Sequence, residues 1–483
     1  EVRLSVCVNL FNLTQNRWKL KKISYIQTIT EMKKTIIILV LCMPIWIHAQ
    51  SWLNSESIVL ENHNLTVDTY AQKIKAFKSD VLIGITKQHG GNYHFTALFD
   101  GNSIIHESDL NNPNLHISDF CILKDWIYFC GKMDLSGGNF MGIIGRFKID
   151  DFLDDGYFSY EITQIQNTEN LTNLVAYNTD NEPDVTHIVA IGDDAIQGCI
   201  VCLDDRNNPD FEYTVLECPQ QQPLYEIFHD ITFDEKYVIM LSHRYPSNHF
   251  ILRYAYKEYP ELYQTHQQGD YHFPNQSFIY SFDKREYQLH LTLLPNNMLA
   301  VSTTAVDAQD NFFTMINFIN VGDLTNPPTN QVIYHMDKMI RTLEMEYSIE
   351  SDSLLLLEST NLFGSGWIES VSFVNPWLQS PYLSRTKFLP NLDPLNHLCL
   401  VPDYGYAVAG SEYSTGDQFY WIKKVNNDQY SCDKYETIKI DATAQGSVSS
   451  YLLPSPVITT IPCQWNGNNA GNNPMQISIE CQN

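Results

Sequence analysis

The chain has 483 residues, of which 44% are hydrophobic and 18% charged, and its formal net charge at pH 7 is −26. A surface this acidic repels phosphate backbones and anionic lipid. The composition therefore argues against nucleic acid as a partner, favours solubility and leaves cationic partners open.

Residues 32–49, MKKTIIILVLCMPIWIHA, have the pattern of a signal peptide. Lys33 and Lys34 supply the positive charge, an apolar stretch follows, and Ala49 is the small residue at the cleavage position. The apolar stretch is shorter than the roughly 20 residues of an ordinary membrane span, so we expect no transmembrane anchor.

Met32 is the first plausible start, so residues 1–31 are expected to be an upstream extension outside the native protein. The first 50 residues carry seven Lys/Arg and two Asp/Glu, and the net charge without them is −31. The mature chain should begin at or near Gln50 and be exported, to the periplasm, the cell surface or the medium.

A four-residue apolar run that ends in a small residue, after a turn rich in Asp, Asn or Pro, recurs along the remainder. The closing residues of the seven runs are Gly84, Gly131, Gly192, Ser242, Ser302, Ser359 and Gly410, at a mean spacing of about 54 residues. An apolar segment precedes each run and two extended segments follow most of them, which predicts four strands per unit. The runs are almost wholly apolar, as expected for strands that are covered on both faces.

A four-stranded sheet every 40 to 60 residues or so resembles the seven-bladed β-propellers. The resemblance is one of architecture and points to no named family. It implies an all-β fold with seven four-stranded blades over residues 50–445 and a C-terminal tail, 446–483, that packs on the propeller or closes it. Eight blades and tandem β-sandwiches are the alternatives, the former because the tail contains the strand-like pieces SSYLL and QISIE.

The familiar catalytic and nucleotide-binding motifs are absent: the P-loop, the dinucleotide fingerprint, HExxH, G-x-S-x-G and the EF-hand loop. We therefore predict no catalytic residue, no metal ligand and no cofactor. Cys199 and Cys202 have the spacing of metal ligands, but residues i and i+3 of a strand face opposite sides of a sheet. Both are expected to pack in the core.

The first strand of each unit carries the first candidate site. Counting back about twelve residues from the closing positions, or more where a turn is longer, finds Asp119, Asp230, His290, Arg341 and His397. First strands lie closest to the axis of a propeller, so we predict a ring of these residues around the channel. Such a ring suits binding of a cation or small polar ligand, or acid–base chemistry; the alternative is an ordinary wet channel wall. Function through this ring predicts that Asp119→Asn with Asp230→Asn abolishes binding or turnover and leaves the fold intact, whereas an ordinary channel wall predicts no change.

The second candidate is the tyrosine-rich segment 253–282, with Tyr256, Tyr259, Tyr263 and Tyr271 as its proposed binding residues. Exposed aromatic rings with polar tips suit recognition of proteins or sugars. The alternative is that these tyrosines simply cover an outer strand.

The sequence thus predicts an exported propeller that acts as a binding or interaction module of the bacterial envelope or cell exterior, with a protein or glycan as its possible ligand. The alternative function is a hydrolase or lyase that acts on a polysaccharide or peptide at the channel mouth. Propellers host both kinds of function, so the fold does not separate them. The oligomeric state is left open.

Overall fold

The structure is a computed structural model, and it falls into two compact units, Glu1–Asn54 and Ser55–Asn483. It describes residues 55–61, 69–78, 81–88, 92–99, 105–155, 158–193, 197–206, 210–217, 225–245, 249–258, 260, 270–272, 289–306, 312–321, 330–335, 339–349, 352–361, 367–374, 382–387, 397–401, 405–414, 417–425, 435–439, 447–449, 457–472 and 476–482. The predicted upstream extension and signal peptide lie outside these residues. Within them, no helix has the length and apolar character needed to cross a membrane.

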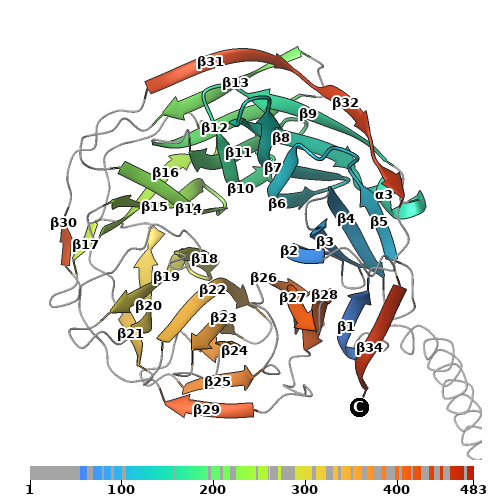
Figure 1. The fold of residues 1–483 in the computed structure, drawn as a ribbon. Helices are drawn as coiled ribbons and strands as arrows, with labels where there is room; N and C mark the ends of the chain where they lie inside the picture. The colour runs from blue at the N-terminus through green and yellow to red at the C-terminus, as the bar shows by residue number, and fades with distance from the viewer. Residues whose placement is uncertain are drawn as a thin grey trace, which may run out of the picture. The chain divides into compact units, whose positions relative to one another are not determined.

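Antiparallel sheets make up the described part of Ser55–Asn483, together with the short helix α3, Ile149–Asp155 (Figure 1). One sheet contains β2 (Thr69–Lys78), β3 (Val81–Gln88), β4 (Tyr93–Phe99), β5 (Ile105–Asp109) and β33 (Gly471–Asn472). The next contains β6 (Leu115–Leu123), β7 (Trp126–Leu135), β8 (Asn139–Lys148), β9 (Ser159–Ile165) and β32 (Asn466–Asn469). The third contains β10 (Asn170–Tyr177), β11 (Thr186–Asp193), β12 (Gly198–Asp205), β13 (Asp210–Glu217) and β31 (Val457–Gln464).

The chain then forms a three-stranded sheet of β14 (Tyr225–Phe233), β15 (Tyr237–Tyr245) and β16 (His249–Tyr256), and a separate pair of β17 (Asp270–His272) with β30 (Ser447–Ser449). A four-stranded sheet follows, with β18 (His290–Leu294), β19 (Met298–Val306), β20 (Phe312–Asn320) and β21 (Asn330–His335).

Two further five-stranded sheets end the series. One contains β22 (Met339–Ser348), β23 (Ser353–Asn361), β24 (Trp367–Val374), β25 (Tyr382–Lys387) and β29 (Tyr435–Lys439). The other contains β26 (His397–Val401), β27 (Gly405–Ser414), β28 (Asp417–Val425), β1 (Ser55–Glu61) and β34 (Gln476–Gln482).

The sheets are arranged around a common centre, with the first strand of each sheet on the inside (Figure 1). Along the chain, β2, β6, β10, β14, β18, β22 and β26 each contact the next first strand, and β26 contacts β2. The predicted all-β propeller fold is therefore confirmed as a propeller arrangement of small antiparallel sheets. Five of the sheets formed by the described residues have five strands each, and the count of seven blades stays a prediction.

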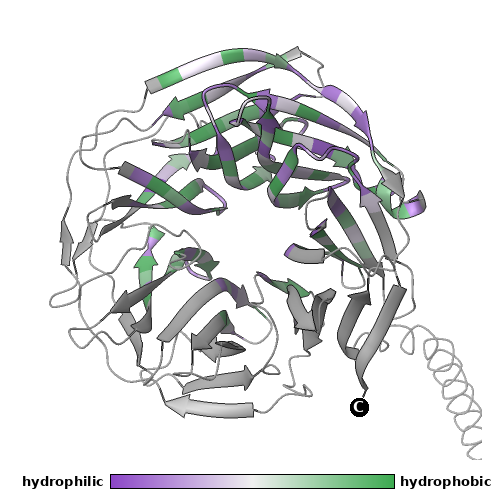
Figure 2. Ribbon diagram, viewed as in Figure 1, coloured by the Kyte–Doolittle hydropathy of each residue, from purple (hydrophilic) through white to green (hydrophobic). Residues whose placement is uncertain are grey.

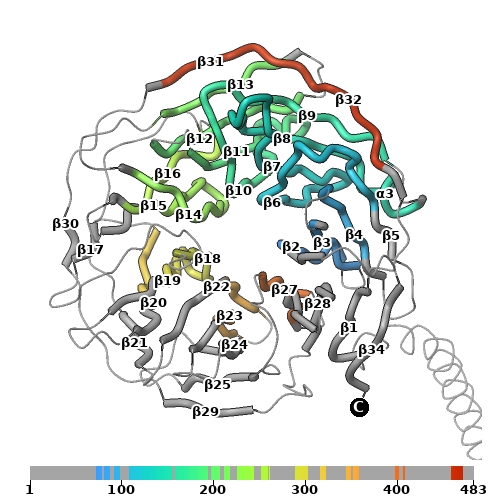
Figure 3. Tube along the Cα trace, viewed as in Figure 1, coloured from blue at the N-terminus to red at the C-terminus, as the bar shows by residue number. Residues whose placement is uncertain are grey.

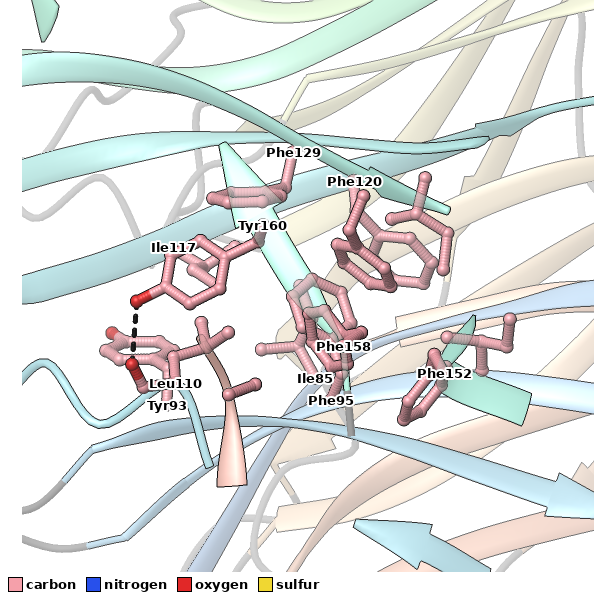
Figure 4. Close-up of a cluster of buried hydrophobic side chains, with 14 of the residues drawn as sticks. Ile85, Tyr93, Phe95, Leu110, Ile117, Phe120, Phe129, Phe152, Phe158 and Tyr160 are labelled. Carbon is pink, nitrogen blue, oxygen red and sulfur yellow. Dashed lines mark hydrogen bonds between the residues drawn. The ribbon is translucent and has the colours of Figure 1, made fainter. Parts of the chain in front are cut away.

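Apolar side chains fill the spaces between successive sheets, because alternate residues of a strand point to opposite faces. In β7, Phe129 packs towards the β2–β5 sheet, whereas Tyr128 and Cys130 pack towards the β10–β13 sheet. Figure 4 shows the first of these clusters, in which Phe95 meets Phe129 and the Tyr160 hydroxyl donates to the Leu110 carbonyl at 2.7 Å. The middle strands of the sheets are accordingly rich in hydrophobic residues (Figure 2).

The two cysteines with metal-ligand spacing follow the same rule. Cys199 is fully buried in the cluster shared with the β6–β9 sheet, and Cys202 is buried in the cluster shared with β14 and β15. The prediction that they face opposite sides of a strand and pack in the core is confirmed.

The closing small residues all lie on second strands, from Gly84 in β3 to Gly410 in β27. The reason is clearest at Gly131 in β7, where a Cβ would overlap the carbonyl oxygen of His116 on the neighbouring first strand. Gly192 in β11 is in the same position relative to the Asn170 carbonyl. A small residue is needed where the irregular first strand comes closest to the second.

Candidate axial site

The first strands carry a repeated irregularity. In five sheets the first strand has an extra residue opposite its partner at a register shift directly before a polar residue, and β2 has a second shift before Lys78. A bulge of this kind bends the strand and changes the direction of nearby side chains. The residues that follow the five bulges are Lys73, Asp119, Asn173, Asp230 and Glu344.

The two other first strands, β18 and β26, begin with a histidine. His290 is 8% exposed and His397 is 5% exposed. We call the polar side chains that meet here the axial cluster: Lys73, Lys75, Asp119, Asp230, His290, Glu344, Glu346 and His397.

Three members of the axial cluster connect one first strand to the next. Asp119 Oδ2 accepts the backbone N–H of Leu174 in β10 at 3.1 Å, and Asp230 Oδ2 accepts that of Leu291 in β18 at 2.9 Å. Neighbouring first strands share no sheet ladder, so these N–H groups need a side-chain acceptor.

The third connection closes the series between the last sheet and the first. His397 Nδ1 accepts the N–H of Ile74 in β2 at 3.5 Å. Because the acceptor nitrogen of a neutral imidazole carries no proton, the proton of His397 is on Nε2. This Nε2 lies 3.1 Å from Glu344 Oε2, where it donates to the carboxylate.

The β2–β6 half of the cluster contains the cations. Lys73 Nζ lies 3.0 Å and Lys75 Nζ 3.7 Å from Asp119 Oδ1. Burial raises the pKa of the Asp119 carboxyl, but the two ammonium groups lower it further, so it ends below its ordinary value. Burial lowers the pKa of Lys73, but Asp119 and Glu344 raise it by more, and Lys73 stays charged.

The β14–β22 half contains carboxyl groups without a cation of their own. His290 Nδ1 lies 3.9 Å from Asp230 Oδ2 and 3.6 Å from Glu344 Oε1. Burial lowers the pKa of His290 to about 4, so the imidazole is neutral at pH 7. Burial, with the ammonium groups of β2, also holds the pKa of His397 well below its ordinary value.

These carboxyl groups are therefore partly protonated near neutral pH. Burial raises the pKa of Asp230 to about 6 and that of Glu344 to about 7. Glu346 is two residues beyond Glu344 on the same face of β22, and burial together with the Glu344 charge raises its pKa to about 8. The described residues offer Glu346 no hydrogen bond or ion pair.

The cluster is reached by solvent. Part of each side chain is exposed to solvent: 15% for Glu344, 17% for Asp230 and 31% for Lys75. Its chemistry suits two tasks, which are holding a small cation against the carboxyl groups and exchanging protons with a ligand. In the described part of the chain, no three His, Cys, Asp or Glu side chains are placed to hold a metal ion.

Four of the five residues predicted for the ring, Asp119, Asp230, His290 and His397, meet in this cluster. Arg341 does not take the equivalent position. It lies in β22 opposite Ser359, three residues before Glu344, and its side chain is outside the described residues. Whether the ring binds anything stays a prediction.

Sequence reasoning missed four members: Lys73, Lys75, Glu344 and Glu346. Counting back twelve residues from Gly84 reaches Gln72, one residue beyond Lys73, and counting back from Ser359 reaches Tyr347, three residues short of Glu344. A usable sign was present, since HISDF, IFHDI and RTLEM each place a carboxylate directly before an apolar residue.

The tyrosine-rich segment is described only in part. Tyr256 ends β16 and packs half-buried against Tyr237, with ring centroids 5.1 Å apart. Tyr271 lies in β17 opposite Val448 of β30. Tyr259 and Tyr263 lie outside the described residues. The described contacts of Tyr256 are those of a side chain that covers a strand, and binding by this segment stays a prediction.

Comparisons with known proteins assign the chain to no family. No protein-family model matches the chain, and no curated protein does. Among solved structures, the chain is similar to a xylan β-1,4-xylosidase from Bacillus halodurans C-125, at 8% identity and a TM-score of 0.25, over 85% of this chain and 99% of that one.

Proposed function

We propose that the protein is an exported, seven-bladed β-propeller that acts as a binding module, and that its axial cluster binds a small molecule carrying a protonated amine. Support for seven blades comes from the closed succession of first strands and from β1, which completes the last sheet beside β28. Support for export comes from the sequence of residues 32–49.

The observation that carries the binding proposal is the uneven distribution of charge in the axial cluster. Lys73 and Lys75 both pair with Asp119. Among the described residues, Asp230 and Glu344 form no ion pair with a lysine or arginine; their partners within 4 Å are imidazoles that are neutral at pH 7, although the Lys73 charge lowers the pKa of both carboxyl groups. Buried ionisable groups are unfavourable unless they are paired, and they gather at functional sites. A cationic ligand would supply the missing partner.

An amine fits this half of the cluster better than a metal ion does. An ammonium group donates three hydrogen bonds and suits carboxylate oxygens at varied angles, whereas metal ions need several ligands at fixed distances. The described residues show no such set of ligands. Ligand binding would favour ionised Glu344 and Glu346, so protons should be released and affinity should rise with pH up to about 8.

The alternative function, a hydrolase or lyase acting on a polysaccharide or peptide, has one supporting observation. The pKa of Asp119 lies below its ordinary value while that of Glu344 is about 7, and carboxyl groups with separated pKa values are typical of acid–base pairs. An enzyme of this kind would release new reducing ends or peptide termini, which a binding module would not.

The proposal is tested by calorimetric titration of the mature protein with glucosamine, ethanolamine and lysine at pH 7, where the amines are largely protonated, with glucose as the neutral match to glucosamine. We expect an amine to bind, glucose not to bind, and the double variant Glu344→Gln, Glu346→Gln to lose at least tenfold in affinity. Binding that is equal for glucose and glucosamine, or unchanged in the double variant, would overturn the assignment. The intact mass of the exported protein, expected to begin at Gln50, tests export separately.

A further inference from the structure

The C-terminal segment runs along the outside of the sheets. From β31 to β33 the chain is extended over residues 457–472 and pairs in turn with β13, β9 and β5. Figure 3 shows β31 and β32 as one continuous course over the outer edges of two sheets. We call residues 457–472 the strap. It visits the three sheets in the reverse of their order along the chain.

Each of the three strands beneath the strap is the last strand of its meander and would otherwise be an edge. Such an edge presents unpaired N–H and C=O groups to any extended segment. β31 pairs with β13 over all eight positions from Asp210 to Glu217. The strap therefore occupies an extended main-chain binding surface.

Most of the strap is held through its backbone. In β31 exposed and half-buried residues alternate, and Ile458 is 53% exposed. All four residues of β32, the sequence NGNN, are exposed and hydrophilic (Figure 2). The N–H of Ala470 donates to the Phe158 carbonyl at 3.0 Å.

Trp465 anchors the strap between β31 and β32, while Ile461 and Cys463 of β31 pack against the same core cluster. The Trp465 ring lies 5.0 Å from the Phe211 ring and 4.6 Å from the Arg146 guanidinium carbon. The other neighbours of Arg146 fix its position: the Trp126 ring lies 4.9 Å away, Glu161 accepts from Nε at 2.7 Å, and the Asp205 carboxylate accepts from Nη1. Trp465 thus joins a preformed cation–π arrangement.

We propose that the outer edges of β13, β9 and β5 form a strand-addition surface, and that it takes up the strap of a second copy of the chain whenever its own strap is displaced. Segment exchange between identical chains uses contacts that already exist in the single chain. Strand addition of this kind draws affinity from main-chain hydrogen bonds and specificity from alternate side chains. Trp465 supplies the specific contact.

The test uses full-length mature protein and a fluorescent peptide of residues 455–474. Trp465→Ala should weaken the protein's own strap, with Ile458→Ala as the matched control, since Ile458 lies in the same strap and points outward. We expect the Trp465→Ala variant to bind the wild-type peptide at least tenfold more tightly than the wild-type protein does. The Ile458→Ala variant should bind the peptide as the wild-type protein does.

Trp465→Phe keeps an aromatic ring over Arg146 and should restore most of the wild-type behaviour, which separates anchoring from general damage to the fold. Equal peptide binding by Trp465→Ala and Ile458→Ala would overturn the proposal. Tight binding of a scrambled peptide would overturn it as well, because it would show unspecific edge pairing.

Discussion

The two halves of the axial cluster accommodate buried charge in different ways. On the β2–β6 side, the Lys73 ammonium lies 3.0 Å from Asp119, and both groups stay ionised. On the β14–β22 side, Glu344 has two neutral imidazoles as neighbours, and burial raises its pKa to about 7. Burial thus gives a fixed ion pair where a lysine contacts the carboxylate and a titratable carboxyl where no lysine contacts it.

The largest effect should come from breaking the ion pair. Asp119→Ala removes the partner of Lys73 and the acceptor of the Leu174 N–H. Losing one member of a buried pair leaves the other uncompensated, so we expect the free energy of unfolding to fall by about 3–5 kcal/mol. Urea unfolding measures this. Asp134→Ala, whose carboxyl is 39% exposed, is the control and should change stability by about 1 kcal/mol or less.

The connection to Leu174 also changes what we expect of the double substitution Asp119→Asn with Asp230→Asn. The two carboxylates each accept backbone N–H groups from two strands. An asparagine offers one oxygen in place of two. We therefore expect the double variant to lose stability as well as any function, whereas the sequence alone led us to expect an intact fold.

The next largest effect should be a pH dependence of stability that arises from the β14–β22 half of the axial cluster. Glu344 and Glu346 have a pKa of 4.5 in the unfolded chain. In the folded protein the pKa is about 7 for Glu344 and about 8 for Glu346. Between these values the folded state binds more protons than the unfolded state, so stability is fully present below about pH 4.5 and declines as pH rises towards 8. The midpoint of urea unfolding should fall from pH 5 to pH 8. A Glu344→Gln, Glu346→Gln variant with the same slope as the wild type would contradict this assignment.

A smaller effect should follow from the His397→Ala substitution. It removes the acceptor of the Ile74 N–H and the donor to Glu344 between the last sheet and the first. An unsatisfied buried group costs about 1–3 kcal/mol, which we expect as the loss in unfolding free energy. His116→Ala removes a histidine that is 25% exposed and should cost less. An equal loss in the two variants would mean that the connection to Ile74 adds nothing.

The smallest effect should distinguish the two lysines. Lys75 is 31% exposed and lies 3.7 Å from Asp119, whereas Lys73 is 14% exposed and lies 3.0 Å away. Lys75→Ala should therefore change the free energy of unfolding by about 1 kcal/mol or less. A loss as large as that of Asp119→Ala would show that both ammonium groups are needed for the pair.

The sequence was sufficient for the features that repeat locally. Apolar runs closed by a small residue predicted the second strands, because residues such as Gly131 must leave room for the carbonyl of an irregular first strand. The same counting located Asp119 and Asp230. It failed at Glu344, because bulges and turn lengths vary between units and a fixed offset does not follow them.

The pairing of the strap could not be predicted from local sequence patterns, for a different reason. The pairing of β31 with β13 joins residues that lie far apart in the sequence, and no local pattern specifies such a partner. The NGNN stretch of β32 has the composition of a turn, and it is a strand only because the edge of β9 provides its hydrogen bonds. QISIE was recognised as strand-like and lies in β34, beside β1.

The central claim is that Glu344 and Glu346 change protonation near neutral pH while the Asp119 pair does not. Carbon-13 NMR titration of the side-chain carboxyl groups measures this directly. The signals are assigned with the Glu344→Gln, Glu346→Gln and Asp119→Asn variants. We predict midpoints near 7 for Glu344 and near 8 for Glu346, and a midpoint below the ordinary aspartate value for Asp119. Titration of both glutamates near their ordinary value of 4.5 would contradict the account.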